Sequence, residues 1–160
     1  MAGTGPILIA YDGSAGAREA IARAGQILGD HGAIVLTVFE PIGPPDPSHP
    51  IDAILSAIGT PPEEFNREAE RLAREMAEDG CRRAAAAGVD ASPRAEPLRD
   101  SVVRTILDAA EATDACAVVV GSRGRSPARE LLLGSVSAAV ARATERPLLV
   151  VPPPKDGASA

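Results

Sequence analysis

Two short glycine-containing segments in the last third of the chain have the residue types best suited to bind an anion. The first is Gly121-Ser122-Arg123-Gly124, and the second, nine residues later, is Gly134-Ser135-Val136-Ser137. Because glycine has no Cβ, its backbone can approach a ligand closely. N–H groups at the start of a helix lack intrahelical partners and lie at the positive end of the helix dipole, so they bind phosphate. The alternative is a loop with ordinary turn glycines.

The charges near these segments suit an anion, although the whole chain is acidic. Arg123, Arg125 and Arg129 lie in or beside the loop, against Glu130 alone. The net charge of −6 and the isoelectric point near 4.9 argue against non-specific binding to nucleic acid or to an anionic membrane. Arginines are also common in solvated loops. The local charge therefore favours a small phosphate ligand without requiring one.

Several polar side chains near the glycine segments have two candidate roles each. Ser135 and Ser137 can donate to phosphate, and Ser135 can equally cap the last helix. Arg123 can reach phosphate or ribose from inside the loop, or it can be solvated. Asp12 follows the first apolar run, where it can contact a ligand or cap the helix that begins near Ser14.

The chain shows no convincing catalytic or metal-binding set. It has no G-x4-G-K-[ST] loop, and the glycine segments contain no lysine. Asp12 has no lysine or histidine beside it in the sequence, whereas general acid–base catalysis needs a proton carrier of suitable pKa. Cys81, Cys116, His31 and His49 have no metal-ligand spacing. We expect structural or solvent-exposed roles for these four, a reducing cytoplasmic compartment, and no signal peptide or membrane span.

The elements that must position these residues alternate between strand and helix, which predicts a parallel α/β sheet. Strands are expected at residues 7–11, 33–39, 89–96, 116–120 and 148–151. Most of them are apolar almost throughout, as in strands that are covered on both faces. The third is weakened by Pro93 and therefore belongs at an edge of the sheet.

Four helices are expected between the strands, at residues 14–28, 61–87, 100–112 and 135–144. Thr60, Pro61 and Glu63 form a capping-box pattern at the start of the long helix, and Asp100 is a plausible cap for the next. Helical spacing predicts buried stripes on the last three helices. These stripes are Phe65, Ala69, Leu72, Met76 and Ala84; Val103, Ile106, Leu107 and Ala110; and Val136, Ala139, Val140 and Ala143.

Five strands and four helices with right-handed crossovers predict a flavodoxin-like or Rossmann-like three-layer sandwich. Ligands in such sheets bind at the carboxyl ends of the strands, where the strand order reverses. That point lies between the first and fourth strands, at Asp12 and Gly121. The length suits one domain over residues 1–160, with a proline-rich insertion at 41–61 and a flexible tail at 153–160. The insertion is expected to be either a flap over the site or disordered.

The spacing G-x2-G-x9-G-[ST] resembles the nucleotide-binding signature of the universal stress protein family, in its ATP-binding branch. The resemblance covers roughly residues 5–153, since residues 7–14 are similar to the family's first strand with its aspartate, and residues 146–152 to its last strand. It implies the strand order 3-2-1-4-5 and an adenine pocket lined by Ala10, Tyr11 and Val38. The chain departs from the family pattern in lacking a glycine before residue 100 and in having Cys116 where an acidic residue is usual.

The resemblance implies a protein that holds ATP, with or without Mg²⁺, as a switch or reservoir in a stress response, with little or no turnover. A slow ATP hydrolase or nucleotidyl transferase and a cyclic-AMP-binding protein are the alternatives. It also implies a homodimer that pairs the edge strand Leu148 to Val151 across a two-fold axis. The candidate nucleotide-binding residues are Ala10, Tyr11, Asp12, Val38, Val120, Gly121, Arg123, Gly124, Gly134, Ser135, Val136 and Ser137.

Overall fold

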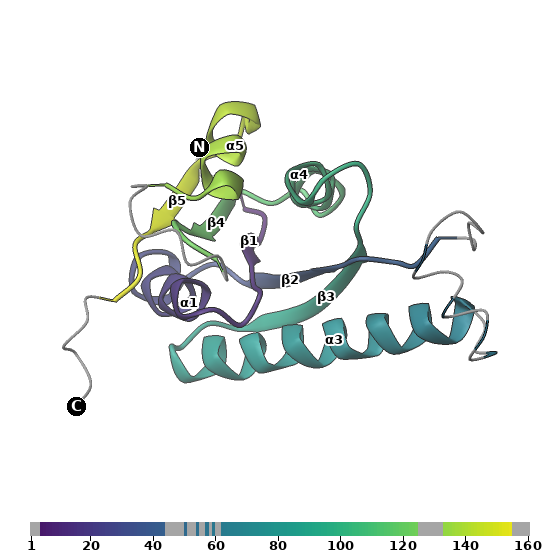
Figure 1. The fold of residues 1–160 in the computed structure, drawn as a ribbon. Helices are drawn as coiled ribbons and strands as arrows, with labels where there is room; N and C mark the ends of the chain where they lie inside the picture. Colours follow the sequence, from purple (N-terminus) through teal and green to yellow (C-terminus); the bar gives the residue numbers. More distant parts are fainter. Residues whose placement is uncertain are drawn as a thin grey trace.

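The computed structural model describes residues 4–43, 50, 54, 57, 59, 62–124 and 133–154. A five-stranded sheet lies at the centre, with helices on both sides (Figure 1). In chain order the elements are β1 (Ile7–Ala10), α1 (Ala15–Leu28), β2 (Ala33–Phe39), α3 (Pro62–Ala86), β3 (Ala91–Pro97), α4 (Val102–Ala112), β4 (Ala117–Gly121), α5 (Ser135–Ala143) and β5 (Leu148–Val151).

The strand order is β3-β2-β1-β4-β5 and every pair is parallel, which confirms the predicted α/β fold and its topology. The central strand β1 pairs with β2 on one side and β4 on the other, so Ile9 lies between Val35 and Val119. The chain runs from β1 through α1 to β2 on one side, whereas it crosses from β3 through α4 to β4 on the other side of β1. The carboxyl ends of β1 and β4 therefore flank the point where the strand order reverses.

The two faces of the sheet bury alternate residues of the same strands. Ile7 and Ile9 face α1 and α3, whereas Leu8 faces α4 and α5, and all three are fully buried. Figure 1 shows α1 and α3 on one side of the sheet and α4 and α5 on the other. Because both sides are covered, successive residues of the inner strands must all be apolar, as the sequence predicted.

The buried stripe of α3 differs from the prediction. Leu72, expected to be inside, is 52% exposed. Ala84 is buried as predicted, and the other buried residues of α3 are the small residues Ala73, Ala77 and Gly80. A Cβ on Gly80 would lie 2.6 Å from Val35 Cγ1 and 3.1 Å from Tyr11 Cδ1. The helix thus lies too close to the sheet at this point to admit even a methyl group.

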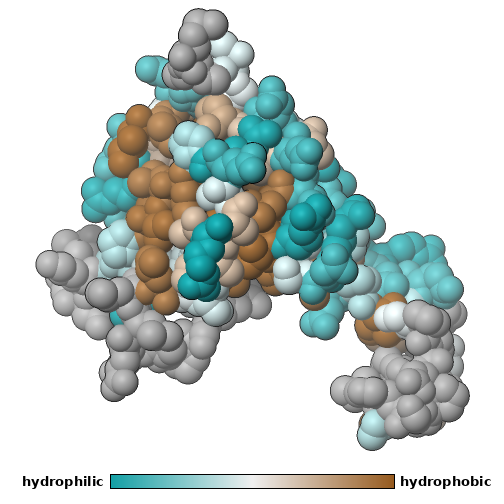
Figure 2. Space-filling view, turned by 90° about the horizontal axis from the view of Figure 1, so that it is seen from above, coloured by the Kyte–Doolittle hydropathy of each residue, from teal (hydrophilic) through white to brown (hydrophobic). Residues whose placement is uncertain are grey.

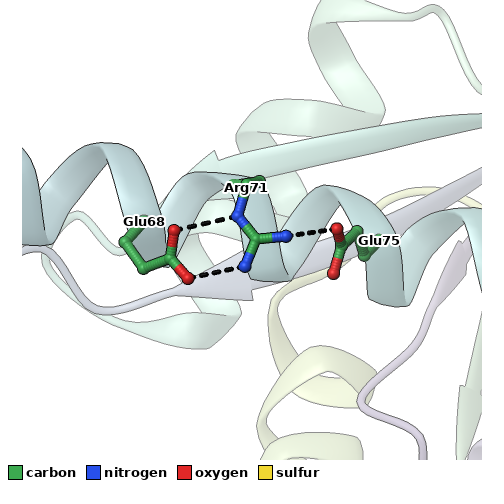
Figure 3. Close-up of polar contacts among 3 residues, drawn as sticks. All are labelled: Glu68, Arg71 and Glu75. Carbon is green, nitrogen blue, oxygen red and sulfur yellow. Dashed lines mark hydrogen bonds and ion pairs between the residues drawn. The ribbon is translucent and has the colours of Figure 1, made fainter.

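The opposite face of α3 is charged, as expected. Figure 3 shows Arg71 between Glu68 and Glu75, which lie about one helical turn away on either side. The guanidinium donates two hydrogen bonds to Glu68, at 2.6 and 2.8 Å, and another to Glu75. All three side chains are more than half exposed, so this network keeps the face solvated and contributes little to stability.

Some predicted element ends are wrong by one or two residues. Ser101, and not Asp100, caps α4, because its side chain accepts the N–H of Arg104. Strand β4 begins at Ala117, one residue after Cys116. Ala143, predicted to face inward, is exposed. The predicted capping residues Thr60 and Pro61 lie outside the described residues.

The start of the predicted insertion is tied to α3. Asn66 accepts the N–H of Ile42 at 2.7 Å and donates to its carbonyl at 3.0 Å. Most of residues 44–61 lie outside the described residues, so a flap over the site stays a prediction, as does a single domain over residues 1–160. Each helix among the described residues is too short or too polar to span a lipid bilayer.

Candidate nucleotide-binding site

A cavity of about 520 Å³ lies at the carboxyl ends of β1, β2 and β4. All twelve residues proposed from the sequence line it, although they come from segments up to 127 residues apart (Ala10 to Ser137). Six further residues line it that sequence reasoning missed: Ser14, Ala17, Leu36, Val102, Ile106 and Ser122.

For some of these six residues the sequence contains a signal that could have placed them at the cavity, and for others it does not. Leu36 is two residues from Val38, and residues two apart on a strand share a face. Ser122 lies inside the glycine segment itself. Val102 and Ile106 are spaced four apart and so share a face of α4. Only the packing of α4 across the sheet brings that face to the cavity, and no local pattern signals it.

The motif glycines are required first by the packing of the protein itself. A Cβ on Gly121 would lie 2.8 Å from the carbonyl carbon of Gly16, so β4 and the start of α1 touch through their backbones. A Cβ on Gly134 would lie 2.9 Å from the carbonyl oxygen of Ser122. That same oxygen accepts the N–H of Gly134 at 2.6 Å. These contacts close the base of the loop and fix the backbone that faces the cavity.

Helix α5 begins at the cavity without a side-chain cap. Gly134 is its N-cap, whereas α1 is capped by Ser14, which accepts the N–H of Ala17 at 3.2 Å. Ser135 is the first helical residue, so the alternative that it caps α5 is wrong. The first-turn N–H groups of a helix have no partners within it, and those of α5 belong to residues that line the cavity. The helix start can therefore receive an anion.

The hydroxyl group of Ser137 faces the protein. It is 2% exposed and lies 3.0 Å from the carbonyl oxygen of Gly134 and 3.2 Å from that of Ser122. A hydroxyl has one proton to donate, and these two carbonyls compete for it. The side chain thus braces the loop against α5, and the backbone N–H is the group that Ser137 can offer to a ligand.

Asp12 connects the two sides of the cavity mouth. Its Oδ1 accepts the N–H of Ser14 at 3.0 Å, while Ser14 itself caps α1, so the alternative role of Asp12 as the cap is wrong. Its Oδ2 lies 3.0 Å from the position that a Cβ on Gly124 would occupy. Gly13, between Asp12 and Ser14, has φ +77°, a conformation that favours glycine. The turn therefore directs the Asp12 carboxylate toward the glycine loop.

Tyr11 lines the cavity at the end of β1, but its ring packs in the core between the sheet and α3. The residue is 2% exposed, and its hydroxyl donates to Asp79 Oδ2 at 2.6 Å. Arg83 donates to the same carboxylate at 2.8 Å. Burial, followed by the hydrogen bond to Asp79, raises the pKa of Tyr11 above its usual value. The hydrogen bonds from Arg83 and Tyr11 lower the pKa of Asp79.

The remaining wall is apolar and comes from three strands and α4. Its side chains are Ala10, Leu36, Val38, Val102, Ile106 and Val120. Ile106 and Leu36 are 1% exposed and form the floor, whereas Val102 is partly exposed at the rim. This half of the cavity can accept a flat apolar group.

Positive charge and metal-ligating capacity are both limited among the described residues. Arg123 lines the cavity, and Arg125, Arg129 and Glu130 lie outside the described residues. Asp12 is the one carboxylate in the described lining. In the described ranges, no group of three or more histidine, cysteine or acidic residues could hold a metal ion. The donor set thus fits Mg²⁺ brought by phosphates and sharing one carboxylate, and it does not fit an all-protein metal site.

The fold defines an α/β protein of the flavodoxin-like type, and the cavity lies at its topological switch point. The chain belongs to the universal stress protein family, whose model matches residues 3–152. A curated relative, the universal stress protein in the QAH/OAS sulfhydrylase 3′ region of Thermus aquaticus, is 33% identical over 147 residues. That match covers 91% of this chain and 96% of the relative.

Solved structures share the fold at lower identity. Universal stress protein UspA from Lactobacillus plantarum has a TM-score of 0.71 at 19% identity, covering 94% of this chain and 99% of its own. A universal stress protein from Archaeoglobus fulgidus, solved in complex with dAMP, has a TM-score of 0.60 at 19% identity, covering 94% and 99%. Another universal stress protein, solved in complex with cAMP, has a TM-score of 0.61 at 24% identity, covering 95% and 100%.

Proposed function

We propose that this protein binds an adenine nucleotide, and ATP in particular, in the cavity at the carboxyl ends of β1 and β4. One observation carries the proposal: backbone N–H groups of a glycine loop and a helix start face one part of the cavity, and apolar side chains face the other. A nucleotide has the same division between charged phosphates and a flat base. The dAMP and cAMP complexes of the relatives support this ligand class.

The phosphates would lie against residues 121–124 and the start of α5. Backbone N–H groups and the α5 dipole favour negative charge there, and Arg123 adds a cation. Asp12 faces the same loop, where an ion carried by the phosphates could bind its carboxylate. These groups need no lysine to hold a polyphosphate.

The base would lie against the apolar wall formed by β1, β2 and α4. A volume of about 520 Å³ falls within the range of small-molecule sites. Val38 is near the carboxyl end of β2, where we expect its backbone to contact the edge of the base. Leu36 and Ile106 supply the apolar floor beneath it.

We expect little or no turnover, so that ATP acts as a switch or a reservoir. Apart from Arg123, the titratable side chains in the described lining are Asp12 and Tyr11. The Tyr11 hydroxyl is bonded to Asp79, away from the ligand, and its pKa is raised. General acid–base catalysis by Asp12 would need a second side chain that acts as the acid, and the Tyr11 hydroxyl does not face the ligand. Phosphate release from ATP that disappears in Asp12→Ala, with ATP binding retained, would favour a slow hydrolase instead.

A matched pair of charge variants tests the site. Gly124→Asp adds a carboxylate next to Asp12 at an exposed position. Gly43→Asp adds the same charge at a residue outside the lining of this cavity, where a Cβ meets nothing within 4 Å. A unit charge near a phosphate opposes it by about 4 kcal/mol at 4 Å and an effective dielectric constant of 20. In equilibrium dialysis with labelled ATP, we therefore expect Gly124→Asp to weaken binding at least about tenfold and Gly43→Asp to leave it unchanged. Absence of wild-type binding at millimolar ATP would overturn the proposal.

Cyclic AMP is the second candidate, favoured by the relative solved with that ligand. The two nucleotides share the base, so the apolar wall accepts either. The second set of N–H groups at α5 distinguishes them, because a polyphosphate can reach both the loop and the helix start. We expect ATP to displace bound cyclic AMP at a lower concentration than cyclic AMP displaces ATP. The reverse order would assign the site to the cyclic nucleotide.

We also propose that two copies of the chain form a homodimer by pairing their β5 strands, and that bound nucleotide influences this dimer. Among the described residues β5 pairs with β4 alone, and Leu148, Leu149 and Val150 are only partly buried. Figure 2 shows hydrophobic residues gathered on the left of the molecule, the side on which β5 lies in Figure 1. The N–H of Ser122 donates to the carbonyl of Val151 at 2.7 Å, which ties the glycine loop to this strand. Analytical ultracentrifugation with and without ATP tests it, and a monomer at tens of micromolar under both conditions would contradict it.

A further inference from the structure

A cysteine and a histidine meet at the end of the sheet opposite the cavity. Cys116 Sγ lies 3.7 Å from His31 Nδ1, although the two residues are 85 positions apart in the chain. His31 precedes β2 and Cys116 precedes β4, so the pair lies at the amino ends of the strands. The sequence predicted no such arrangement for either residue, and the structure corrects that prediction. His49 lies outside the described residues.

Backbone hydrogen bonds hold both partners in place. The N–H of Cys116 donates to the carbonyl of Pro6 at 2.9 Å, and the N–H of His31 donates to that of Leu28 at 3.0 Å. Gly32, next to His31, accepts the N–H of Ile7 at 2.8 Å. Three chain segments are thereby joined around the pair, and its geometry follows from the rigid sheet. Both side chains are half-buried, so small molecules in solution can reach them.

The chemistry of the pair depends on proton transfer from sulfur to nitrogen. A thiolate, and not a thiol, is the nucleophile in cysteine chemistry. With the ring proton on Nε2, Nδ1 of His31 can accept the thiol proton, and the resulting imidazolium lies beside the thiolate. Arg146 donates to the carbonyl of Ala115, which anchors a further cation on the residue before Cys116. Asp114, which contacts Arg146 at 3.6 Å, has an almost fully exposed side chain.

The second cysteine provides a contrast within the same molecule. Cys81 lies on α3, where it is also half-buried. Burial, and then the charge of Glu78, raises the pKa of its thiol. No histidine accompanies it among the hydrogen bonds of the described residues. The two cysteines are therefore both half-buried and differ in their immediate partners.

We propose that Cys116 is a site of covalent modification by small soft electrophiles, and that hydrogen peroxide is its natural reactant. His31 takes the thiol proton. The sulfur lone pair attacks one peroxide oxygen, a sulfur–oxygen bond forms and the oxygen–oxygen bond breaks. The departing hydroxide takes the proton from His31 and leaves as water. Sulfur is oxidised by two electrons to a sulfenic acid and peroxide is reduced, and a thiol reductant can reverse the change. The proposal does not depend on nucleotide binding.

Peptide-level mass spectrometry on the whole protein tests it. The protein is treated with a small excess of hydrogen peroxide and a 1,3-diketone that traps sulfenic acid, and separately with iodoacetamide. In the wild type, Cys116 should react at least about tenfold faster than Cys81 with both reagents, since rates follow the thiolate fraction. Equal rates, or faster reaction at Cys81, would overturn the proposal without any variant.

His31→Gln then tests the role of the histidine. This substitution keeps a polar side chain but removes the base, so the Cys116 rate should fall at least about fivefold while the Cys81 rate stays constant. Cys81 also reports on folding, because loss of the fold would expose it and accelerate its reaction. An unchanged Cys116 rate in a folded His31→Gln variant would refute the participation of His31.

Discussion

Replacing Tyr11 with phenylalanine would remove one hydroxyl group from the wall behind the cavity and leave the ring. That hydroxyl donates to Asp79 Oδ2 at 2.6 Å, from a residue that is 2% exposed. The bond connects the end of β1, which carries Asp12, to α3. Tyr11→Phe thus tests how firmly the long helix holds the strand end that forms the site.

The expected cost follows from the two partners. A hydrogen bond to a charged acceptor contributes about 1.5 to 3 kcal/mol to stability. The Asp79 side chain is 37% exposed and keeps its bond to Arg83, so water can replace the lost donor. The lower end of that range applies, and we expect Tyr11→Phe to lower the free energy of unfolding by about 1.5 kcal/mol. For a chain of this size the midpoint of thermal unfolding should fall by about 3 to 6 °C.

Urea denaturation of a double-mutant cycle would measure this bond. The variants are Tyr11→Phe, Asp79→Ala and the double substitution, and the cycle removes the separate contributions of Arg82 and Arg83 to Asp79. We expect a coupling free energy of at least about 1 kcal/mol. Coupling near zero, or a Tyr11→Phe variant as stable as the wild type, would refute the assignment of this bond as a stabilising link.

Three further predictions concern stability. The raised pKa of Tyr11 means that the folded protein holds the phenol proton more tightly, so stability should fall as pH rises above about 10. Tyr11 is the one tyrosine of the chain, so phenolate absorbance measures this directly, and Tyr11→Phe should remove that dependence. Gly80→Ala gains about 1 kcal/mol of helix propensity but places a Cβ 2.6 Å from Val35 Cγ1, an overpacking that costs about 1 to 3 kcal/mol. We expect a net loss on calorimetry, and a stabilised variant would contradict the close packing of α3. Leu72→Gln, at a 52% exposed position, should change stability by less than about 0.5 kcal/mol, whereas a larger loss would place Leu72 in a core.

The sequence predicted the sheet well because its signals are local. Strands covered on both faces must be apolar at successive positions, and the alternation with helices dictates parallel pairing. The glycine loop was found for a similar reason, since its spacing lies within one strand–loop–helix unit. The structure adds that Gly121 and Gly134 are required by contacts with Gly16 and Ser122, which the spacing does not reveal.

Features that depend on packing between distant segments were missed or misplaced. Helical spacing of apolar residues placed Leu72 in the core, although the contact of α3 with the sheet selects small residues such as Ala77 and Gly80. The direction of the Ser137 hydroxyl depends on the position of the carbonyl group of Ser122, the residue that follows β4. The approach of His31 to Cys116 joins residues 85 positions apart, and no sequence pattern at either position indicates it.

The central claim is that backbone N–H groups at the end of β4 and the start of α5 hold the phosphates of a nucleotide. Backbone amide NMR during an ATP titration tests it most directly, because each glycine gives a separate signal. The account predicts saturable shifts at Gly121, Gly124 and Gly134, with Gly43 and Gly88, which do not line the cavity, unchanged. Saturating ATP that leaves the three loop glycines unmoved, or that shifts only residues away from the cavity, would contradict it.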